Sequence, residues 1–484
     1  MDMRKLDSYR ETNRLEAKAA GFNLPRSLWE TYSSFANTVG GVILLGVEER
    51  GKNLQAVGVS NPEKLLDDFW NAVNNPQKVS SNILSEEDVV VSDWGGKTII
   101  SITVPRANRH LRPVFIDNNP LTGTFRRNHG GDYRCSYETI RAMMRDAAEE
   151  SQDTCLVECV SLSELDYDTV RRYRNRYNQF NEDHVWSSLP DDEFLRRIGA
   201  ARRMDDGTVR LTVAGLLMFG QDWRITAEFP QYFLDYREQG DPTLRWEDRV
   251  TSQTGDWSGN VYDFYFRIYQ KLTPALKVPF KMEGMSRIDD TPAHKALREA
   301  LVNCLTNADY HGRRGLVVLR TPERIELANP GGFRVDVDAA ISGGVSDPRN
   351  ATMLKIFSFV EIGERAGSGL PKVFNGWKAC DLPEPVITES FDPDRTTLVL
   401  PLQDENRPQK PAAKTGRVGK VREEQVLELL DKEGPLGKLA ISETLGLGAS
   451  RTKEILSRMV AKGMIVPEGA SRARVYRLPV DESD

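Results

Sequence analysis

The sequence predicts a multidomain protein of mixed α/β and α+β class. At 484 residues the chain is too long for one hydrophobic core, so we expect three or four domains. Helix and strand patterns alternate over residues 1–145 and again over 293–402. A polar stretch with Pro and Gly, residues 404–420, has the composition of a linker and precedes a compact last segment.

Composition bounds the class of protein. With 39% hydrophobic and 28% charged residues the chain is typical of a soluble globular protein. No apolar run approaches the roughly 18 residues of a membrane span, and the first residues lack the apolar core of a signal peptide, so we expect a cytoplasmic protein with no membrane partner. The net charge of −6 argues against attraction to nucleic acid by bulk charge, but Lys and Arg outnumber Asp and Glu nearly two to one over residues 407–479.

The first predicted domain covers residues 1–150. A helix is expected over 24–37, because Leu28, Trp29, Tyr32 and Phe35 form one apolar stripe. The other expected elements are a strand over 42–47, a helix from 61 to about 73, a strand over 98–104 and a helix over 137–150.

The later segments follow the same rules. Residues 151–290 form a middle α/β segment, which is either a separate domain or an extension of the next one. Residues 291–403 form the third domain, and residues 421–484 the last. The expected elements are helices over 168–177, 261–272 and 293–309, strands over 315–319, 324–328 and 396–401, and three helices with a two-stranded wing after 421.

A cluster of charged side chains lies within the first fifty residues. Glu16 and Lys18 share one face of a predicted strand, Glu49 ends a neighbouring strand, and Glu11 lies just upstream. Carboxylates at strand ends suit Mg2+ or Mn2+, and a lysine beside them can orient the attacking water of a metal-dependent nuclease. The alternative is a set of solvated charges on an edge strand.

A basic loop over residues 124–134 is a candidate nucleic-acid contact. Arg126, Arg127 and Arg134 are interleaved with Phe125 and Tyr133. Arginines with aromatic neighbours suit phosphate contact combined with base stacking. A solvated hairpin is the alternative.

Three features of the third domain together predict a nucleotide pocket. Glu299 and Asn303 share a helix face, and an amide beside a carboxylate can hold Mg2+ against a triphosphate. A tight Asn-Pro-Gly-Gly turn lets backbone approach a base, and a Gly-Ser-Gly loop before a helix favours phosphate. Each piece alone is more often an ordinary turn or loop. The residues are Glu299, Asn303, Asn329, Gly331, Gly332, Gly367, Ser368 and Gly369.

The last domain has the length and element order of a winged helix-turn-helix. Ser450 is a good N-cap for its third helix. The predicted contacts are Arg451, Thr452, Lys453 and Arg458 of that helix in the major groove, and Arg472 and Arg474 of the wing on phosphate or the minor groove. The alternative is a winged helix that binds protein.

The N-terminal motifs resemble the Schlafen-type AlbA-like domain. They are Glu11-x4-Glu16-x-Lys18, Phe35-Ala-Asn-Thr-x-Gly-Gly and Leu45-Gly-Val-Glu-Glu49. The resemblance implies that Glu11, Glu16 and Glu49 bind metal, as the acids of Schlafen nucleases do when they cleave structured RNA such as tRNA. The chain has Thr12, Ala17 and Glu49 where the family pattern has Ser, Phe and Asp. Many bacterial members are described only as DNA-binding.

The third domain resembles the GHKL ATP-binding fold and, in detail, the C-terminal domain of proteins often labelled RecG-like DNA helicases. The motifs are His294-Lys-Ala-Leu-Arg-Glu-Ala-Leu-Val-Asn303, Asn307-Ala-Asp-Tyr310, Gly363-Glu-Arg-Ala-Gly-Ser-Gly-Leu370 and a strand with Thr397. The resemblance implies ATP binding and adds Asp309 and Thr397 to the site. Asn329 stands where GHKL enzymes have an adenine-reading Asp. No Gly-x4-Gly-Lys-Ser/Thr loop is present, so helicase motor activity is not expected. The alternative is a fold retained for regulation or dimerisation.

Two functions follow. The first is a nucleic-acid-binding protein that acts as a metal-dependent endonuclease on RNA or DNA, regulated by nucleotide in the third domain. The second is a transcriptional regulator that binds DNA in response to ATP or another ligand without catalysis. A homodimer is compatible with both functions, since operators are commonly palindromic. Metal-dependent turnover would distinguish the first from the second.

Overall fold

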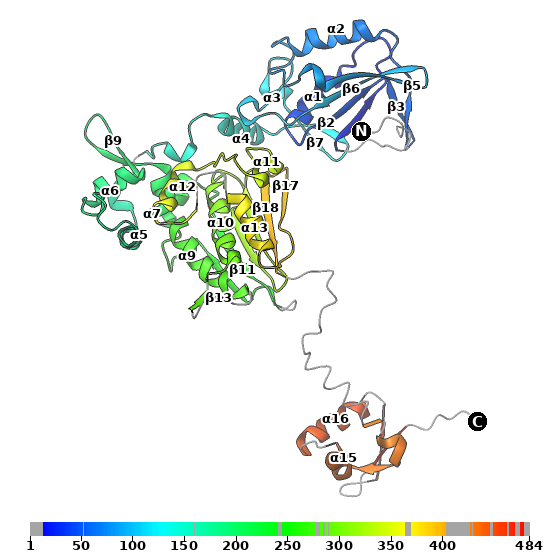
Figure 1. The fold of residues 1–484 in the computed structure, drawn as a ribbon, viewed down its shortest axis with the longest axis vertical. Helices are drawn as coiled ribbons and strands as arrows, with labels where there is room; N and C mark the ends of the chain where they lie inside the picture. Colours follow the sequence, from blue (N-terminus) through cyan, green and yellow to red (C-terminus); the bar gives the residue numbers. More distant parts are fainter. Residues whose placement is uncertain are drawn as a thin grey trace. The chain divides into compact units, whose positions relative to one another are not determined.

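A computed structural model describes most of the chain as two compact units, residues 1–404 and 405–484 (Figure 1). The residues that it does not describe are 1–12, 52, 159, 241–243, 277–280, 284–285, 289, 364–368, 403–425, 428, 446–448, 462–463, 470–474 and 479–484. Among the described residues, no helix has both the length and the apolar character needed to cross a membrane. The chain is a mixed α/β multidomain protein with several sheets.

The N-terminal domain, residues 13–136, is built on a four-stranded sheet in the order β1-β2-β6-β5. β1 runs parallel to β2, and the other pairs are antiparallel. The elements are β1 (Leu15–Lys18), α1 (Ser27–Ala36), β2 (Gly41–Leu45), β3 (Val47–Arg50), β4 (Asn53–Ala56), α2 (Pro62–Val73), β5 (Val89–Trp94), β6 (Lys97–Val104), α3 (Pro120–Gly123), β7 (Phe125–Asn128) and β8 (Gly131–Arg134). Helix α4 (Tyr137–Ala147) follows this domain.

Side-chain alternation gives this sheet two apolar faces. Ile43 and Leu45 belong to the core that includes α1 and α2, where Trp29 stacks on Phe69 with ring centroids 5.6 Å apart. Leu44, one residue along, belongs to a smaller core under the β3–β4 hairpin. The strand expected over 42–47 divides because Gly46 has a φ of +83°, which an L side chain rarely adopts.

The central domain, residues 151–402, contains a six-stranded sheet in the order β12-β11-β15-β16-β18-β17. Helices α10 and α13 pack against each other beside this sheet (Figure 1). Its helices are α5 (Tyr167–Phe180), α6 (Asp191–Ile198), α7 (Val213–Phe219), α8 (Asp222–Glu228), α9 (Val261–Leu272), α10 (Pro292–Thr306), α11 (Val337–Ser342), α12 (Ala351–Ser358) and α13 (Gly369–Lys378). Its strands are β9 (Ala201–Arg203), β10 (Val209–Leu211), β11 (Leu234–Glu238), β12 (Asp248–Thr251), β13 (Lys281–Glu283), β14 (Ser286–Ile288), β15 (Leu316–Arg320), β16 (Arg324–Pro330), β17 (Val386–Ser390) and β18 (Arg395–Pro401).

The sequence left open whether residues 151–290 form a domain of their own. In the structure β11 pairs in parallel with β15, so the middle segment contributes two strands to the sheet of the third. One hydrophobic core runs from Val157 to Leu400 and includes side chains of α5, α7, α9 and α10. The two segments therefore share one sheet and one core.

The second unit contains β19 (Leu436–Gly437), α15 (Lys438–Thr444), α16 (Ala449–Ala461), β20 (Val466–Glu468) and β21 (Val475–Arg477). Its strands form an antiparallel sheet in the order β19-β21-β20. Ile441, Leu456 and Met459 are buried in its core. The sequence expected two strands, and the additional short strand β19 immediately precedes α15.

Candidate nucleotide pocket and its connection to the N-terminal domain

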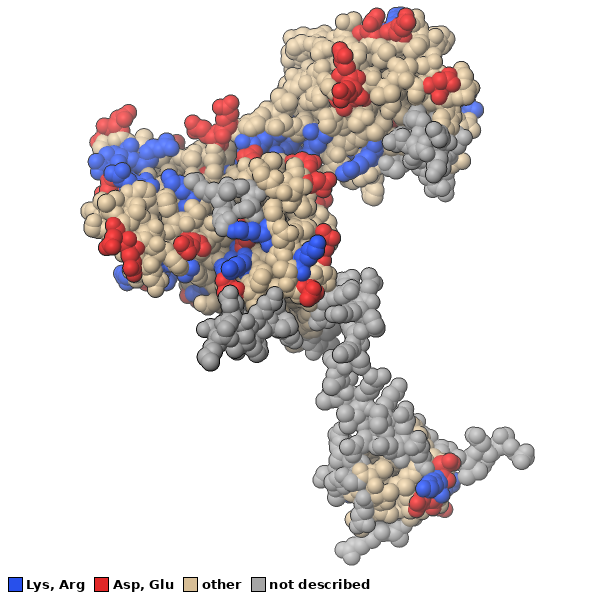
Figure 2. All heavy atoms as spheres, in the orientation of Figure 1, with Lys and Arg blue, Asp and Glu red and all other residues tan. Residues whose placement is uncertain are grey.

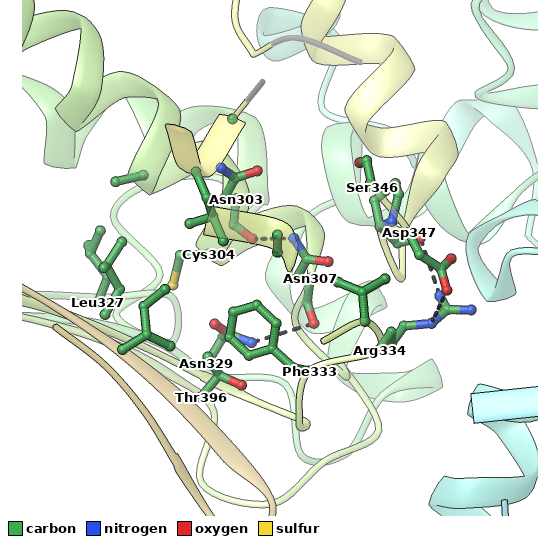
Figure 3. Close-up of a pocket in the computed structure, with 18 of the residues that line it drawn as sticks. Asn303, Cys304, Asn307, Leu327, Asn329, Phe333, Arg334, Ser346, Asp347 and Thr396 are labelled. Atoms are coloured by element: carbon green, nitrogen blue, oxygen red, sulfur yellow. Dashed lines mark hydrogen bonds and ion pairs between the residues drawn. The ribbon is translucent and has the colours of Figure 1, made fainter. Parts of the chain in front are cut away.

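A pocket lies between α10 and the central sheet, and the turn after β16 and the segment up to α12 enclose it (Figure 3). Its volume is about 110 Å³, which is room for several water molecules. The polar or charged side chains in its wall are Asn303, Asn307, Asn329, Arg334, Ser346, Asp347 and Thr396. The remainder is mostly apolar, the usual composition of a small-molecule site.

Helix α10 supplies one wall through residues spaced four apart. Glu299, Asn303 and Asn307 succeed one another on one helix face, because four residues make slightly more than a turn. Asn303 lines the pocket and donates from Nδ2 to Glu299 Oε1 at 3.4 Å, whereas Glu299 is buried behind it. Asn307 donates to the Asn303 carbonyl at 3.0 Å, which fixes its side chain at the end of the helix.

Helix α13 begins against this same face. A Cβ built on Gly369 would lie 2.7 Å from Glu299 Oε1 and 2.8 Å from Asn303 Nδ2. Glycine at this position therefore allows α13 to approach the two predicted site residues of α10. Gly367 and Ser368, the other two residues of the predicted Gly-Ser-Gly loop, lie outside the described residues.

The turn after β16 forms the opposite wall. Asn329 is buried, lines the pocket and donates from Nδ2 to the Asn307 carbonyl at 3.4 Å and to the Pro330 carbonyl at 3.2 Å (Figure 3). Gly331 has a φ of +96°, and Gly332 lines the pocket. Thr396 donates to the Gly331 carbonyl at 2.9 Å and so holds the turn against β18.

Two residues that the resemblance added lie elsewhere. Thr396 and Leu398 line the pocket, and strand alternation places Thr397 on the other face of β18. Asp309 is not part of the pocket wall and forms an ion pair with Arg145 at 3.0 Å. Asp309 is therefore a contact with α4 in this structure.

Arg334 and Asp347 are pocket residues that the sequence did not indicate. Burial lowers the pKa of Arg334 to about 10 although Asp347 lies 3.5 Å away, so the guanidinium stays charged at neutral pH. The Asp347 carboxylate faces the Nε of Arg334 in an ion pair without a hydrogen bond, so this Nε–H has no hydrogen-bond acceptor among the described residues. A buried cation with an unsatisfied donor in a pocket wall suits an anionic ligand. The only feature of the sequence that pointed to Arg334 as a site residue was its position two residues after the predicted Gly-Gly turn.

Asp347 also connects the pocket to the N-terminal domain. Its carboxylate forms a two-armed ion pair with Arg109, which donates further to the carbonyls of Asp146 and Ala148. Arg106 pairs with Glu389 at 2.5 Å and donates to the Phe333 carbonyl at 2.9 Å. These arginines are therefore ion-pair partners of the central domain.

The basic loop also differs from its prediction. Arg126 is half-buried and forms an ion pair with Asp394 of the central domain. Arg127 has a side chain only 1% exposed and pairs with Glu16 at 2.7 Å and Asp132 at 2.9 Å. Both guanidinium groups are largely covered and form ion pairs within the chain, so neither is presented to a phosphate backbone in this structure. Arg134 is exposed and lies 6.0 Å from the Phe125 ring.

The acidic cluster is only partly assembled in the described residues. Glu16 is buried and accepts from Lys18 Nζ at 2.6 Å as well as from Arg127. Glu49 is exposed on β3, and Glu11 lies outside the described residues. The described part of the chain contains no group of three His, Cys, Asp or Glu side chains placed to hold a metal ion. The negative charge of Glu16 is thus balanced by the side chains of Lys18 and Arg127 in this structure.

The predicted contacts of the last domain are only partly described. Thr452 of α16 is 1% exposed, so it belongs to the core rather than to an exposed helix face, as its position four residues before Leu456 indicates. Lys453 is exposed. Arg451 and Arg458 lie on α16, but the structure does not describe their side chains. Arg472 and Arg474 lie outside the described residues.

Comparison with known proteins identifies three segments. Residues 11–136 match the family model described as Schlafen, AlbA_2, and residues 317–400 match the model described as putative ATP-dependent DNA helicase RecG C-terminal. Residues 141–235 match a domain of unknown function. Among curated proteins, none is similar enough to count as a match.

Two solved structures are similar to this chain, one over most of its length and the other over about a quarter. The DIP2311 protein of Corynebacterium diphtheriae is 15% identical over 96% of this chain and 94% of its own, with a TM-score of 0.40. The N-terminal domain of a putative ATP-dependent DNA helicase RecG-related protein from Nitrosomonas europaea is 27% identical over 28% of this chain and 90% of its own, with a TM-score of 0.21. The chain thus combines a segment similar to the Schlafen AlbA_2 family with one similar to the RecG C-terminal family, which indicates a nucleic-acid-related protein.

Proposed function

We propose that this chain binds a nucleotide in the pocket beside α10, binds a nucleic acid, and changes its affinity for the nucleic acid when the nucleotide is bound. The observation that carries the proposal is the position of Asp347. It lines the pocket and forms an ion pair with Arg109 of the N-terminal domain. A ligand that alters the charge or position of this carboxylate acts directly on a contact between the two domains.

The pocket residues have suitable chemistry for ATP. The charged guanidinium of Arg334 attracts phosphate, and Asn303 with Glu299 behind it offers oxygen ligands for a phosphate-bound Mg2+. Asn329 provides an amide that both donates and accepts, which suits a base edge although it replaces the usual carboxylate. The match of residues 317–400 to the RecG C-terminal model supports the same ligand class.

For the N-terminal domain, the contacts of Glu16 favour binding without cleavage over a metal-dependent endonuclease. The charge of Glu16 is already balanced by two cations, Lys18 at Oε1 and Arg127 at Oε2, so a metal ion would compete with them for this carboxylate. We therefore place the ligand-responsive regulator ahead of the endonuclease. The last domain then reads duplex DNA as a winged helix, with Lys453 as an exposed contact.

The test uses the full chain. Calorimetric titration with ATP and Mg2+ compares the wild type with Asn303→Ala, and anisotropy measures binding of labelled duplex DNA and RNA with and without EDTA. We expect ATP binding that is weakened in Asn303→Ala, and nucleic-acid binding that survives EDTA without strand cleavage. Absence of ATP binding would overturn the nucleotide site, and cleavage that stops with EDTA would restore the endonuclease.

A further inference from the structure

A strongly basic groove lies on the central domain between α6, the β9–β10 hairpin and the first turn of α12. Its volume is about 530 Å³, and no carboxylate lines it. Figure 2 shows Lys and Arg side chains gathered over α6 and β9. The cations in its wall are Arg196, Arg197, Arg202, Arg203 and Lys355.

Only part of this charge is balanced within the described residues. Glu193, one turn before them on α6, pairs with Arg196 and Arg197, the latter at 2.9 Å. The described residues provide no carboxylate within ion-pair distance of Arg202 or Arg203, both of which are exposed. The groove therefore has an excess of positive charge.

The arginines of the β9–β10 hairpin repel one another, and packing in the core does not account for their presence. Arg202 stands directly opposite Arg210 across the antiparallel β9–β10 pair. Like charges at such positions destabilise a sheet. Arg202, Arg203 and Arg210 are all exposed, so none of them fills the core. An anion bound in the groove would offset this repulsion.

We propose that this groove binds the phosphate backbone of a nucleic acid. Arginine forks bind phosphate through paired hydrogen bonds. The other wall residues, Thr154, Gly199, Ala201, Thr212, Ala351 and Thr352, are small and offer none of the aromatic anchors on which protein partners dock. The inference rests on the proposed function for its nucleic acid, and the four arginines of the groove lie within residues 141–235, which match a domain of unknown function.

The experiment measures binding of a fluorescein-labelled DNA duplex, and of the RNA duplex of the same sequence, across a range of KCl concentrations. The full-length variant Arg202→Gln/Arg203→Gln is compared with Arg171→Gln/Arg267→Gln. The control removes the same charge from two exposed arginines of the central domain that do not line the groove. Lys355→Gln tests the α12 wall separately, and thermal unfolding confirms that each variant folds.

We expect the groove variant to bind more weakly, with a plot of log affinity against log salt shallower by about 2, because each lost phosphate contact removes about 0.9 from the slope. The control should keep the wild-type slope. A groove variant indistinguishable from wild type, or from the control, would overturn the groove while leaving the proposed function intact. A wild-type protein that binds neither duplex would overturn both.

Discussion

Buried and half-buried arginines form ion pairs between the N-terminal and central domains. Arg106, Arg109 and Arg126 each pair with a carboxylate of the central domain, and Arg349 pairs with Asp146 of α4 at 2.8 Å. Removing one partner of such a pair leaves a charge in a desolvated place, which costs far more than losing a surface pair. A change in the charge of either partner is therefore expected to weaken the contact between the domains.

The pair of Asp146 and Arg349 predicts a pH dependence of stability. Burial alone would raise the pKa of Asp146, but the neighbouring Arg349 outweighs it and the pKa is lowered. A carboxyl with a lowered pKa in the folded state stabilises the fold above its unfolded pKa of about 3.9, and this stability is lost as the pH falls through the folded pKa. We expect denaturant unfolding to show a steeper loss of stability below about pH 4 in the wild type than in Asp146→Asn. Equal slopes would contradict the assignment.

The two neighbouring threonines of β18 provide a matched pair for the pocket. Thr396 donates to the Gly331 carbonyl and lines the pocket, whereas Thr397 does neither. We expect Thr396→Val to weaken ATP binding about two- to tenfold. The substitution removes the hydrogen bond to the Gly331 carbonyl, which contributes about 0.5–1.5 kcal/mol and holds the turn that forms the pocket wall. Thr397→Val should bind ATP like the wild type in the same calorimetric titration. The reverse order would show that the ligand lies on the other face of the strand.

Among the elements, α10 and α13 pack against each other, and two glycines of α13 face different parts of α10. A Cβ on Gly369 would displace the side-chain ends of Glu299 and Asn303, whereas one on Gly376 would meet the Pro292 carbonyl at 2.7 Å and Ala296 Cβ at 2.9 Å. The first set of atoms belongs to the pocket, and the second to the helix packing.

This contrast predicts opposite effects of two alanine substitutions. Gly369→Ala should weaken ATP binding by about tenfold or more, equivalent to about 1.4 kcal/mol, with a smaller loss of stability. Gly376→Ala should lower the free energy of unfolding by about 1–3 kcal/mol through overpacking, with ATP affinity retained. Calorimetry and chemical denaturation measure the two quantities. Parallel losses in both variants would show that α13 has no specific part in the site.

The elements were predictable where their signal is local. Helix α9 begins and ends where the sequence predicted, because apolar periodicity and the Asn260 cap act within one segment. The β9–β10 hairpin was missed because each of its strands has only three residues, which is too short for an alternating pattern to stand out. The helix face with Glu299 and Asn303 was predictable from spacing alone.

The site residues that escaped prediction depend on contacts far apart in the sequence. Arg126 meets Asp394 across 268 positions, and Arg109 meets Asp347 across 238. A basic stretch looks the same whether its partners are phosphates or distant carboxylates, so the sequence alone could not tell that Arg126 and Arg127 form ion pairs within the chain. The sequence predicted Thr397 as a site residue, whereas Thr396 lines the pocket, because one residue along a strand changes the face.

At the scale of the whole molecule, we propose that binding of nucleotide and binding of nucleic acid are coupled through one carboxylate. Allosteric coupling is reciprocal, so ATP must change nucleic-acid affinity by the same factor as nucleic acid changes ATP affinity. Asp347→Asn removes the charge that joins the pocket to Arg109. Asp309→Asn is the matched control, because Asp309 also joins the central domain to α4 but does not line the pocket.

The most direct measurement is therefore the affinity of the full chain for duplex DNA and RNA with and without saturating ATP, in the wild type, Asp347→Asn and Asp309→Asn. We predict that ATP changes the affinity about fivefold or more in the wild type and in Asp309→Asn. In Asp347→Asn both ligands should still bind, but the factor should fall to nearly one. An affinity that ATP leaves unchanged in the wild type, or a coupling that Asp347→Asn retains in full, would contradict the account.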